Sequence, residues 1–337
     1  MSERAQIEND LEHFRAEWDD PSPYMTVQTS GSTGTPKQMR VLKERMRASA
    51  RLTCQFLGLK KGDTALLCMP LRYIAGKMVV VRALEWGLKL LVREPSGHPL
   101  AEPFDGDLDF AAMIPLQVYN SLQVPAERER LTRIRHLIIG GGAIDRELEA
   151  ALRPFPNRIY STYGMTETLS HVAMRRLNGP EASEYYEPFP TVRLSLSPDQ
   201  TLVIDAPLVC DGPLVTNDVV DLQPDGRFRV IGRKDNIINS GGVKIQIETV
   251  EAKLRPFLTA PFAITALPDP KFGEAIVLLT TAVTTTFPPE ALDRYERPKQ
   301  ILRVEAIPMT GSGKIDRAAC RRLAIETNEC QTSKSKR

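Results

Sequence analysis

A short segment rich in Gly, Ser and Thr has the residue types that bind phosphate groups. It runs from Thr29 to Lys37, reads TSGSTGTPK and has little apolar surface to bury. It offers backbone N–H groups, hydroxyl donors and one cation, which suits a polyphosphate. The common P-loop ends in Gly-Lys followed by Ser or Thr, but here Pro36 precedes Lys37 and Gln38 follows it. The segment therefore predicts a phosphate-binding loop of a different kind; the alternative is a flexible linker.

A second segment combines an aromatic ring, a hydroxyl and a carboxylate within eight residues. It reads STYGMTET from Ser161 to Thr168 and follows a predicted strand. Tyr163 offers a ring that can stack on adenine, and Thr166 offers a hydroxyl to phosphates. Glu167 offers a carboxylate that can hold Mg²⁺ between phosphate oxygens. Taken in isolation, Glu167 is as readily a solvated acid of a loop.

Two further segments place glycines where a ligand needs close access to the backbone. Gly140–Ile144 reads GGGAI after a strand-like run, and its glycines let a flat base approach closely. Thr310–Arg317 reads TGSGKIDR, and its glycines flank Lys314, a long cation that can neutralise charge building on a substrate oxygen. The alternatives are an ordinary strand-to-helix turn and a surface lysine in a Gly-rich turn.

Charged and Gly-rich segments in the second half of the chain can also contact a nucleotide. We expect a turn at Thr-Asn-Asp, residues 216–218, in which Asn217 tolerates positive φ. Asp218 can accept two hydrogen bonds from the hydroxyls of a ribose; a lone Asp near a turn is usually a turn former. Residues 232–236 read GRKDN and residues 240–245 read SGGVKI, which is also the composition of an Asn/Gly-rich hairpin.

Alternating strands and helices are expected to position the first group of segments. Apolar residues of 43–57 recur on one helical stripe, Met46, Ala50, Cys54 and Leu57, and Gly58 is a helix stop. Strand–helix alternation is typical of an α/β domain with a parallel sheet. The expected helices are 43–57, 76–86 and one capped by Asp145 and ending at Leu152; the expected strands are 27–29, 64–69, 88–93, 136–139 and 157–162.

The pattern changes to hairpins after residue 190 and then to a new unit. Turn sequences predict one hairpin over 192–205 and another over 219–231, which together form a β-rich subdomain. A helix at 247–254, strands at 262–267 and 275–282 and a helix at 316–324 follow. We therefore predict a large N-terminal domain over residues 1–233 and a small C-terminal α+β domain over 234–337.

Composition excludes several classes of protein. The 337 residues carry a net charge of +2, from 44 basic and 42 acidic residues, which gives no electrostatic basis for binding nucleic acid or an acidic membrane. The five cysteines have no CxxC spacing and predict reduced thiols. The charged N-terminal segment is not a signal peptide, and no run approaches the ~20 apolar residues of a membrane span. We expect a cytoplasmic protein.

Six of these segments occur in the order found in one enzyme family. From Thr26 to Arg317 the chain resembles the adenylate-forming superfamily, which includes acyl-CoA synthetases, luciferases and peptide-synthetase adenylation domains. The resemblance implies a large α/β domain with a parallel sheet and a β-rich subdomain, followed by a small, mobile C-terminal domain. It also implies that the family's usual Thr-Gly-Asp is replaced here by a motif with Asn217.

The resemblance assigns a role to individual residues. It implies that Lys314, Thr166 and Glu167 are catalytic, that Glu167 holds the metal, and that Asp235 is the hinge between the domains. Gly241 and Gly242 would line the access of coenzyme A. The implied ATP-binding residues are Thr29, Ser30, Gly31, Ser32, Thr33, Gly34, Thr35, Lys37, Gly141, Gly142, Ala143, Tyr163, Gly164, Asp218 and Arg233.

The implied reaction has two steps and uses ATP, Mg²⁺ and coenzyme A. A carboxylate attacks the α-phosphate of ATP to give an acyl adenylate, and a thiol then displaces AMP to give a thioester. Positioning and charge neutralisation carry most of such catalysis. Lys314 would bridge the carboxylate and the α-phosphate before the small domain rotates. The partner is a small carboxylic acid, and a homodimer is plausible.

Residues 164–179 most resemble short bacterial o-succinylbenzoate–CoA ligases of menaquinone biosynthesis. Only 28 residues precede Thr29, fewer than in larger family members, and Tyr73 replaces a histidine of the family's gate motif. That aromatic acid has a second carboxylate that does not react, and its pocket needs donors or a cation. Candidates are Arg72, Tyr73, Lys77, Ser170 and His171; the alternatives are solvated surface cations and, for His171, a hydrogen-bonded histidine at a helix start.

Other functions remain open from the sequence. Another aryl- or small-acyl-CoA ligase would carry the same motifs, and so would a stand-alone adenylation domain that loads a carrier protein. A nucleotide- or acyl-binding protein without catalysis would have lost a catalytic group, but Lys314, Glu167 and Asp218 are all present.

Overall fold

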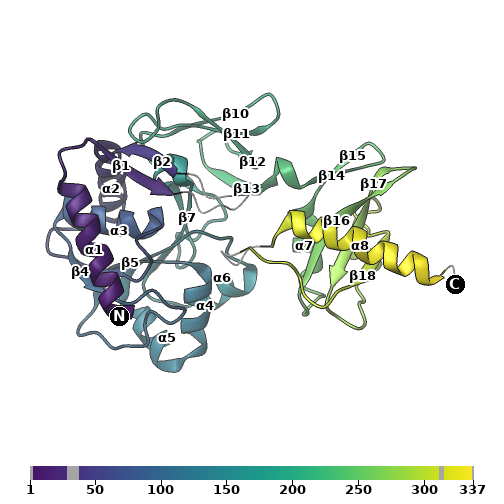
Figure 1. Ribbon diagram of the computed structural model, residues 1–337, viewed down its shortest axis with the longest axis horizontal. Helices are drawn as coiled ribbons and strands as arrows, with labels where there is room; N and C mark the ends of the chain where they lie inside the picture. The colour runs from purple at the N-terminus through teal and green to yellow at the C-terminus, as the bar shows by residue number, and fades with distance from the viewer. Residues whose placement is uncertain (1–2, 29–37, 311–314, 336–337) are drawn as a thin grey trace. The chain divides into compact units, whose positions relative to one another are not determined.

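The computed structural model describes residues 3–28, 38–310 and 315–335 (Figure 1). Two compact units divide the chain. The first comprises residues 1–195, 203–214 and 222–229, and the second comprises 196–202, 215–221 and 230–337. Each unit is described by itself below.

The first unit is built on a seven-stranded, mainly parallel sheet. Four strand pairs from β4 to β7 are parallel, and the last two strands are antiparallel. The central strands are almost wholly buried, because helices cover both faces of a parallel sheet. In spatial order the strands are β4 (Lys89–Val92), β3 (Thr64–Leu67), β5 (Leu108–Met113), β6 (Ile134–Ile139), β7 (Arg158–Gly164), β8 (His171–Arg176) and β9 (Glu187–Pro188).

Helices connect these strands in two opposite directions. From β3 the chain passes through α3 (Ile74–Trp86) to β4 on one side, whereas α4 (Pro115–Gln123), α5 (Pro125–Thr132) and α6 (Arg146–Leu152) connect strands toward the other side. Right-handed crossovers then place α3 and the other three on opposite faces. Figure 1 shows α4, α5 and α6 gathered on the side away from α2 (Lys43–Leu57) and α3. The predicted α/β architecture is confirmed.

The short-range sequence features that predicted α2 and α6 are found in the structure. The stripe of Met46, Ala50, Cys54 and Leu57 is buried, with none of the four more than 3% exposed. Gly58 ends α2 at a φ of 64°. At α6 the carboxylate of Asp145 accepts a hydrogen bond of 2.8 Å from the backbone of the third helical residue, as expected of an N-cap.

The N-terminal helix α1 (Glu3–Asp19) is absent from the sequence prediction, which only excluded a signal peptide there. Ile7, Leu11, Phe14 and Trp18 are buried and recur at spacings of four, three and four residues. That spacing is a helical stripe, so the signal was present in the sequence but was masked by the high charge of the segment. No helix of the described part of the chain is long and apolar enough to span a membrane.

Two smaller sheets lie outside the seven-stranded sheet. β1 (Tyr24–Gln28) and β2 (Gln38–Leu42) pair antiparallel, with Gln28 opposite Gln38. The predicted phosphate-binding loop, residues 29–37, lies outside the described residues. The predicted hairpins are confirmed as a four-stranded sheet in the order β10 (Arg193–Leu196), β11 (Thr201–Asp205), β12 (Leu214–Leu222) and β13 (Phe228–Arg233).

The predicted turn at residues 216–218 is wrong. These residues lie inside β12, where Thr216 and Asp218 are buried and Asn217 is exposed, which is the alternation of a strand. Asn217 is not among the residues with positive φ. The preference of Asn and Asp for turns is overridden here by pairing with the neighbouring strands.

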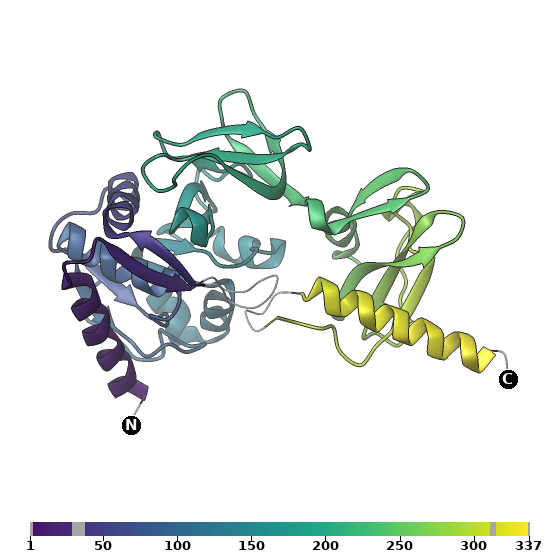
Figure 2. The same cartoon turned by 45° about the horizontal axis from the view of Figure 1, so that its top comes forward.

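The second unit has a five-stranded sheet between two helices, α7 (Ile247–Leu254) and α8 (Arg317–Ser335) (Figure 2). The strands pair in the order β15, β14, β17, β16, and β18 adds to β17 in parallel. α8 continues well beyond the predicted end at residue 324. The strands are β14 (Ile237–Ser240), β15 (Val243–Gln246), β16 (Phe262–Asp269), β17 (Gly273–Thr280) and β18 (Gln300–Arg303).

Alternate residues of the central strands point to opposite faces of the sheet and pack into two separate cores. On β16, Ile264 points into a core with Val250 and Leu254 of α7. Its neighbour Ala263 points into a second core with Cys320 and Ala324 of α8. The period of two along a strand therefore places one helix on each face of this sheet.

Cys54, Cys68, Cys210 and Cys320 are free and buried. Burial raises the pKa of the Cys68 thiol to about 12. Three short 3₁₀ turns, Thr166–Thr168, Lys234–Asn236 and Pro289–Ala291, lie between the larger elements.

Candidate active site

Three of the predicted segments meet at one edge of the first unit's sheet. The segment of Tyr73 follows β3, Gly140–Ile144 follows β6, and Tyr163 lies near the end of β7. These strands are parallel, so their carboxyl ends lie on the same edge. The connections of β3 and β5 run in opposite directions along the sheet, and ligands of open α/β sheets bind beside such a switch point.

The glycine turn and the tyrosine segment are adjacent. Ile139 pairs with Ser161 across β6 and β7, which brings the residues that follow Ile139 beside those that follow Ser161. Gly141 has a φ of 78°, and it and Ala143 are exposed. The half-buried ring of Tyr163 packs edge-on against Phe228 at 4.9 Å between centroids. The exposed backbone of the glycine turn, which has few side-chain atoms, therefore lies next to an aromatic ring.

The loop that carries the predicted metal ligand is held by its own hydrogen bonds. The hydroxyl of Thr168 is fully buried, accepts from the backbone N–H of Met165 at 3.0 Å and lies 2.6 Å from the carbonyl of Ser170. Leu169 has a φ of 64°, a conformation that bulky residues rarely adopt. Glu167 is exposed on this loop, whereas its neighbour Thr166 is buried. Glu167 is therefore exposed on a loop that is held by its own hydrogen bonds.

Gly164 is required by the close approach of the chain on either side of this loop. A Cβ atom at this position would lie 2.3 Å from the carbonyl oxygen of Ser170, which no side chain can accommodate. β7 and β8 can thus be joined tightly only through glycine. Among the described residues, no group of three or more His, Cys, Asp and Glu side chains could hold a metal ion. A metal at Glu167 would need ligand atoms from a bound molecule.

A buried polar network lies beside this loop, and the sequence reasoning missed its central residue. Arg82 of α3 is 2% exposed, and its Nη2 donates a hydrogen bond of 2.6 Å to the hydroxyl of Ser170. Ser170 Oγ lies 3.2 Å from Nδ1 of His171, and His171 Nε2 lies 3.0 Å from Oγ1 of Thr53. The signal in the sequence was a single charged residue within the apolar run of residues 78–83.

Arg82 carries a buried charge without a counter-ion in the described part of the chain. Its Nε is buried and has no hydrogen-bond partner there. Burial lowers the pKa of the guanidinium to about 10, so it remains charged at neutral pH. The ring of Phe110 lies 6.0 Å from its guanidinium carbon. Unpaired buried charge is expensive and is rare away from binding sites.

His171 does not lie at the start of a helix, as one sequence interpretation had it, but opens strand β8. The β8 strand pairs antiparallel with β7, and the ring of His171 packs edge-on against Phe189. Burial, together with the charge of Arg82, holds the pKa of His171 well below its usual range. The imidazole is therefore neutral.

The remaining candidates for the acyl site are placed differently. Arg72 and Tyr73 are exposed and contact each other, with 4.9 Å between the guanidinium carbon and the ring centroid. Lys77 Nζ lies 3.6 Å from the carboxylate of Glu17 and 5.5 Å from the ring of Phe14, both on α1. The structure thus joins Ser170 and His171 in one network and directs Lys77 toward α1.

In the second unit the structure brings Asp218, Arg233 and Asp235 together. Arg233 Nη1 lies 3.3 Å from Asp218 Oδ1, and its Nη2 lies 2.9 Å from Asp235 Oδ2. Asn217 also donates to Asp235 at 3.1 Å. The carbonyl of Arg233 accepts from the amide of Gln246. The predicted nucleotide-binding pair and the predicted hinge residue thus form one polar cluster.

The predicted coenzyme A access consists of the tight turn between β14 and β15. Ser240 pairs with Val243, and the two intervening glycines, Gly241 and Gly242, have φ values of 59° and 82°. Both central residues of such a turn need positive φ, which glycine supplies without strain. Lys314 lies outside the described residues.

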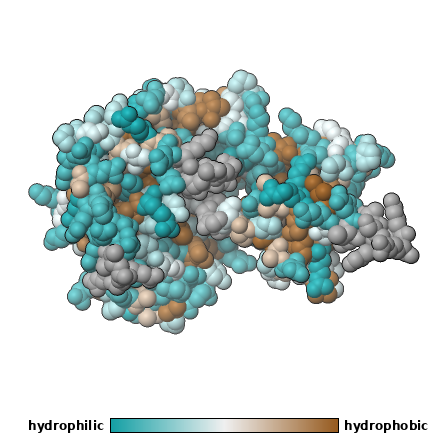
Figure 3. Space-filling view, viewed as in Figure 1, coloured by the Kyte–Doolittle hydropathy of each residue, from teal (hydrophilic) through white to brown (hydrophobic). Residues whose placement is uncertain are grey.

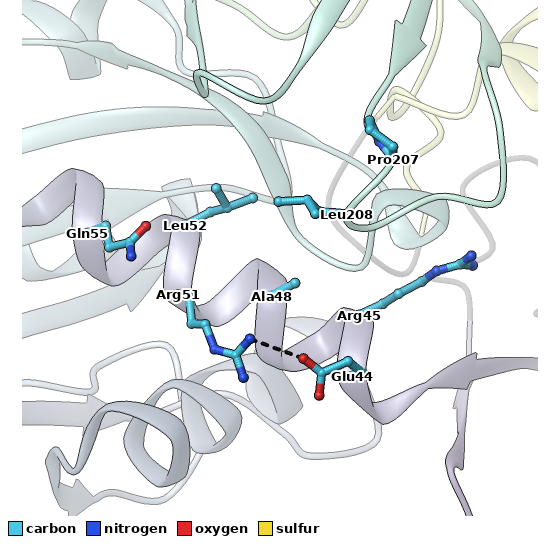
Figure 4. Close-up of a pocket in the computed structure, with 8 residues that line it drawn as sticks. All are labelled: Glu44, Arg45, Ala48, Arg51, Leu52, Gln55, Pro207 and Leu208. Atoms are coloured by element: carbon cyan, nitrogen blue, oxygen red, sulfur yellow. Dashed lines mark hydrogen bonds and ion pairs between the residues drawn. The ribbon is translucent and has the colours of Figure 1, made fainter.

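A shallow groove of about 400 Å³ runs along the outer face of α2 (Figure 4). None of the predicted site residues lines it. Its polar rim is already paired, because Arg51 contacts Glu44 at 3.1 Å and Arg45 contacts Asp211 at 2.6 Å. The groove lining consists of Glu44, Arg45, Ala48, Arg51, Leu52, Gln55, Pro207 and Leu208.

Comparisons with known proteins place this site in a family. The 2-succinylbenzoate–CoA ligase of Listeria monocytogenes is 25% identical over 339 residues, which cover 89% of this chain and 70% of that relative. The structure of o-succinylbenzoate coenzyme A synthetase (MenE) from Bacillus subtilis, in complex with ATP and magnesium ion, has a TM-score of 0.69 at 20% identity. It covers 87% of this chain and 68% of that chain, and it shows a shared fold.

A further solved structure is closer in sequence. The acyl-CoA synthetase (AMP-forming)/AMP-acid ligase II-like protein from Dyadobacter fermentans is 34% identical. The match covers 94% of this chain and 93% of that chain, with a TM-score of 0.64. Residues 2–207 match the family described as AMP-binding enzyme. The resemblance found in the sequence motifs is thereby confirmed: the chain belongs to the AMP-binding enzyme family.

Proposed function

We propose that this chain is an AMP-forming acid–CoA ligase whose acid is 2-succinylbenzoate, also called o-succinylbenzoate. Membership of the AMP-binding enzyme family supports nucleotide-dependent activation of an acid. The relative from Listeria monocytogenes, which is named for this acid, supports the choice of substrate. The products would be o-succinylbenzoyl-CoA, AMP and pyrophosphate.

One observation carries the choice of acid: Arg82 is a buried cation whose Nε has no partner among the described residues. o-Succinylbenzoate has an aliphatic carboxylate that reacts and an aromatic carboxylate that does not. The second carboxylate would supply the missing counter-ion in a site with little water, where a charge pair is strong. A fatty acid or a simple aromatic monoacid would leave Arg82 unpaired.

The proposed chemistry activates a poor acyl donor. An oxygen of the aliphatic carboxylate attacks the α-phosphorus of ATP, the bond to the bridging oxygen breaks, and pyrophosphate leaves. The sulfur of coenzyme A then attacks the acyl carbon, its proton is lost to solvent, and AMP leaves. Both steps depend on positioning and charge neutralisation more than on acid–base catalysis by side chains.

We assign the nucleotide contacts of the first unit to the edge of its sheet. Gly141, Gly142 and Ala143 would lie against the adenine, with Tyr163 stacked on it. Glu167 is exposed on a rigid loop, so its carboxylate fits a role in holding Mg²⁺ together with phosphate oxygens. The bound Mg²⁺ would supply positive charge against the phosphates.

The second unit would supply the remaining contacts. Asp218 and Arg233 would bind the ribose and phosphate, Asp235 would be the hinge, and the turn of Gly241 and Gly242 would line the access of coenzyme A. The roles of the loop at residues 29–37 and of Lys314 remain predictions from the sequence, as do the homodimer and the boundary after residue 233.

A matched pair of acids tests the proposal. Purified protein with Mg·ATP and coenzyme A is assayed for AMP and thioester with o-succinylbenzoate and with 4-oxo-4-phenylbutanoate, which lacks only the aromatic carboxylate. We expect kcat/KM to be at least ~10²-fold higher for the diacid, on the scale of one buried charge-assisted contact. Equal values would refute the assignment of the acid.

The same assay separates the alternative functions. Pyrophosphate release without a coenzyme A thioester would point to a carrier protein as acceptor. Turnover of benzoate or a medium-chain acid in preference to both test acids would indicate another acyl-CoA ligase. Binding of ATP without pyrophosphate release for any acid would support a protein that no longer catalyses.

A further inference from the structure

The network around Arg82 joins two consecutive helices to the start of β8, which lies more than 80 residues further along the chain. Its links run from Arg82 on α3 to Ser170, from Ser170 to His171 on β8, and from His171 to Thr53 on α2. Thr53 in turn donates to the backbone carbonyl of Ser49 at 3.2 Å. Thr53 and His171 are both buried, at 0% and 7% exposed.

The hydroxyl of Thr53 has a single proton, and this fixes the direction of every hydrogen bond in the network. The Thr53 hydroxyl proton is used by the carbonyl of Ser49, so Thr53 Oγ1 must accept from His171. The proton of the neutral imidazole is therefore on Nε2, and Nδ1 is an acceptor. Ser170 donates its proton to that Nδ1 and turns a lone pair toward Arg82, which donates to it.

We propose that His171 is a positioning residue for Arg82. The imidazole, held by Thr53, orients the hydroxyl of Ser170, and that hydroxyl fixes Nη2 of the guanidinium so that Nε is presented to the non-reacting carboxylate of the acid. The inference rests on the proposed function and adds residues that determine specificity without touching the substrate. Ser170 acts through Arg82 in this arrangement because its only proton is used by His171.

The electrostatics of the site agree with this role. A neutral ring adds no second positive charge beside Arg82, so the guanidinium remains the single cation that a carboxylate meets in the network. The imidazole also needs both a donor and an acceptor nitrogen to join Thr53 to Ser170. Glutamine can reproduce that pair of functions, whereas leucine has neither, which gives a direct test.

The test measures the ratio of kcat/KM for o-succinylbenzoate to that for 4-oxo-4-phenylbutanoate. In His171→Leu we expect the ratio to fall at least ~10-fold through a higher KM for the diacid, which corresponds to about 1.4 kcal/mol. Thr53→Val, which keeps the shape but removes the hydroxyl, lowers it in the same direction and by less. His171→Gln retains most of the ratio.

His136→Leu is the matched control, because His136 is a second buried histidine of the same unit, lies on β6 and is not linked to this network by any hydrogen bond of the described residues. It leaves the ratio unchanged even where it lowers stability. An equal loss for both acids in His171→Leu would show a merely structural role and overturn the inference, as would an unchanged ratio.

Failure of the proposed function would give a different result from failure of the role of His171. If wild-type protein already gives a ratio near one, the assignment of the acid fails irrespective of the variants. The hydrogen-bond directions are then tested without substrate by the ¹⁵N chemical shifts of the imidazole. A neutral tautomer with its proton on Nε2, mixed with the other tautomer in Thr53→Val, is expected; a proton on Nδ1 in wild type would overturn the network.

Discussion

Each unit has an arginine that is largely withdrawn from water, and the surroundings of the two charges are opposite: the side chain of Arg317 is 26% exposed and Arg82 is 2% exposed. In the second unit Arg317 makes two hydrogen bonds to Glu251, at 2.5 and 2.8 Å, and Glu251 also accepts from the backbone of Ile264. Burial lowers the pKa of Arg317, but the bonds to Glu251 outweigh it and the net shift is upward. In the first unit Arg82 has one side-chain hydrogen bond among the described residues, to Ser170, and burial lowers its pKa.

The difference separates a structural charge from one kept for a ligand. Arg317 satisfies Glu251 within the fold and fastens the start of α8 to α7 and β16. Arg82 leaves part of its donor capacity unused among the described residues, at a cost to stability that a binding site can justify. The predictions below test this contrast, from the largest expected effect to the smallest.

Removing the paired arginine should destabilise the protein most. Arg317→Leu leaves the carboxylate of Glu251, which is 5% exposed, without its partner. Loss of one member of a buried pair costs about 3–5 kcal/mol, and the 26% exposure of the Arg317 side chain places this loss toward the lower end. Urea unfolding followed by a probe in the second unit measures this, and the double variant Arg317→Leu/Glu251→Leu should recover much of the loss. Equal stability of the wild type and the single variant would refute the structural role.

Removing the unpaired arginine should affect activity and leave stability intact. Arg82→Met keeps the volume and removes a buried charge, so the free energy of unfolding is expected to be unchanged or higher. Activity toward o-succinylbenzoate should fall ~10²-fold, about 2.7 kcal/mol, while that toward 4-oxo-4-phenylbutanoate changes little. A large loss of stability in this variant would contradict the contrast with Arg317.

Mild acid should weaken the first unit through its histidines. All four histidines of the chain precede residue 172, and burial lowers the pKa of His136 to about 4. The folded pKa lies below the unfolded value, so stability is complete above pH ~6.5 and is lost as the pH falls toward 4. At pH 5 the loss from His136 is about 2 kcal/mol.

Thermal unfolding of wild type and His136→Leu between pH 7.5 and 5 checks this prediction. The wild type should lose more stability than the variant over this range. Parallel curves for wild type and His136→Leu would show that the buried imidazole does not titrate as expected.

An exposed arginine should matter least. Arg51 on α2 contacts Glu44 and Glu85, but its side chain is 42% exposed. Surface ion pairs contribute ~0.2–1 kcal/mol because water screens them. Arg51→Met is therefore expected to lower the free energy of unfolding by less than 1 kcal/mol in urea titrations; a loss as large as that of Arg317→Leu would show that exposure does not rank these arginines.

The sequence predicted features that depend on near neighbours. The extent of α2, the Gly58 stop and the Asp145 cap need only a few consecutive residues, and all were correct. The strand at Thr216–Asp218 was missed because pairing with distant strands overrode a local turn preference. The motif residues Gly141 and Tyr163 could be placed because one follows β6 and the other lies near the end of β7, and these two strands are parallel neighbours.

The Arg82 network lay beyond sequence reasoning for a physical reason. Thr53 and His171 are 118 positions apart and meet only because α2 and α3 pack on the face beside β8. A burial pattern can flag Arg82 as unusual, but it cannot give its partner. Lys77, five residues earlier on the same helix, looked equally suitable in the sequence, and the structure directs it toward Glu17.

The side of the molecule drawn in Figure 3 is mostly hydrophilic, and its hydrophobic residues form small separate patches. In the second unit, α8 contributes to keeping apolar residues out of water, because its Cys320 and Ala324 cover the core that also contains Ala263. During synthesis β17 is complete at Thr280, about 44 residues before Ala324 emerges, which takes roughly 2–9 s at ribosomal speeds. For that interval one face of the second unit's sheet lacks the helix that covers it, which leaves an apolar surface open to aggregation or to a chaperone.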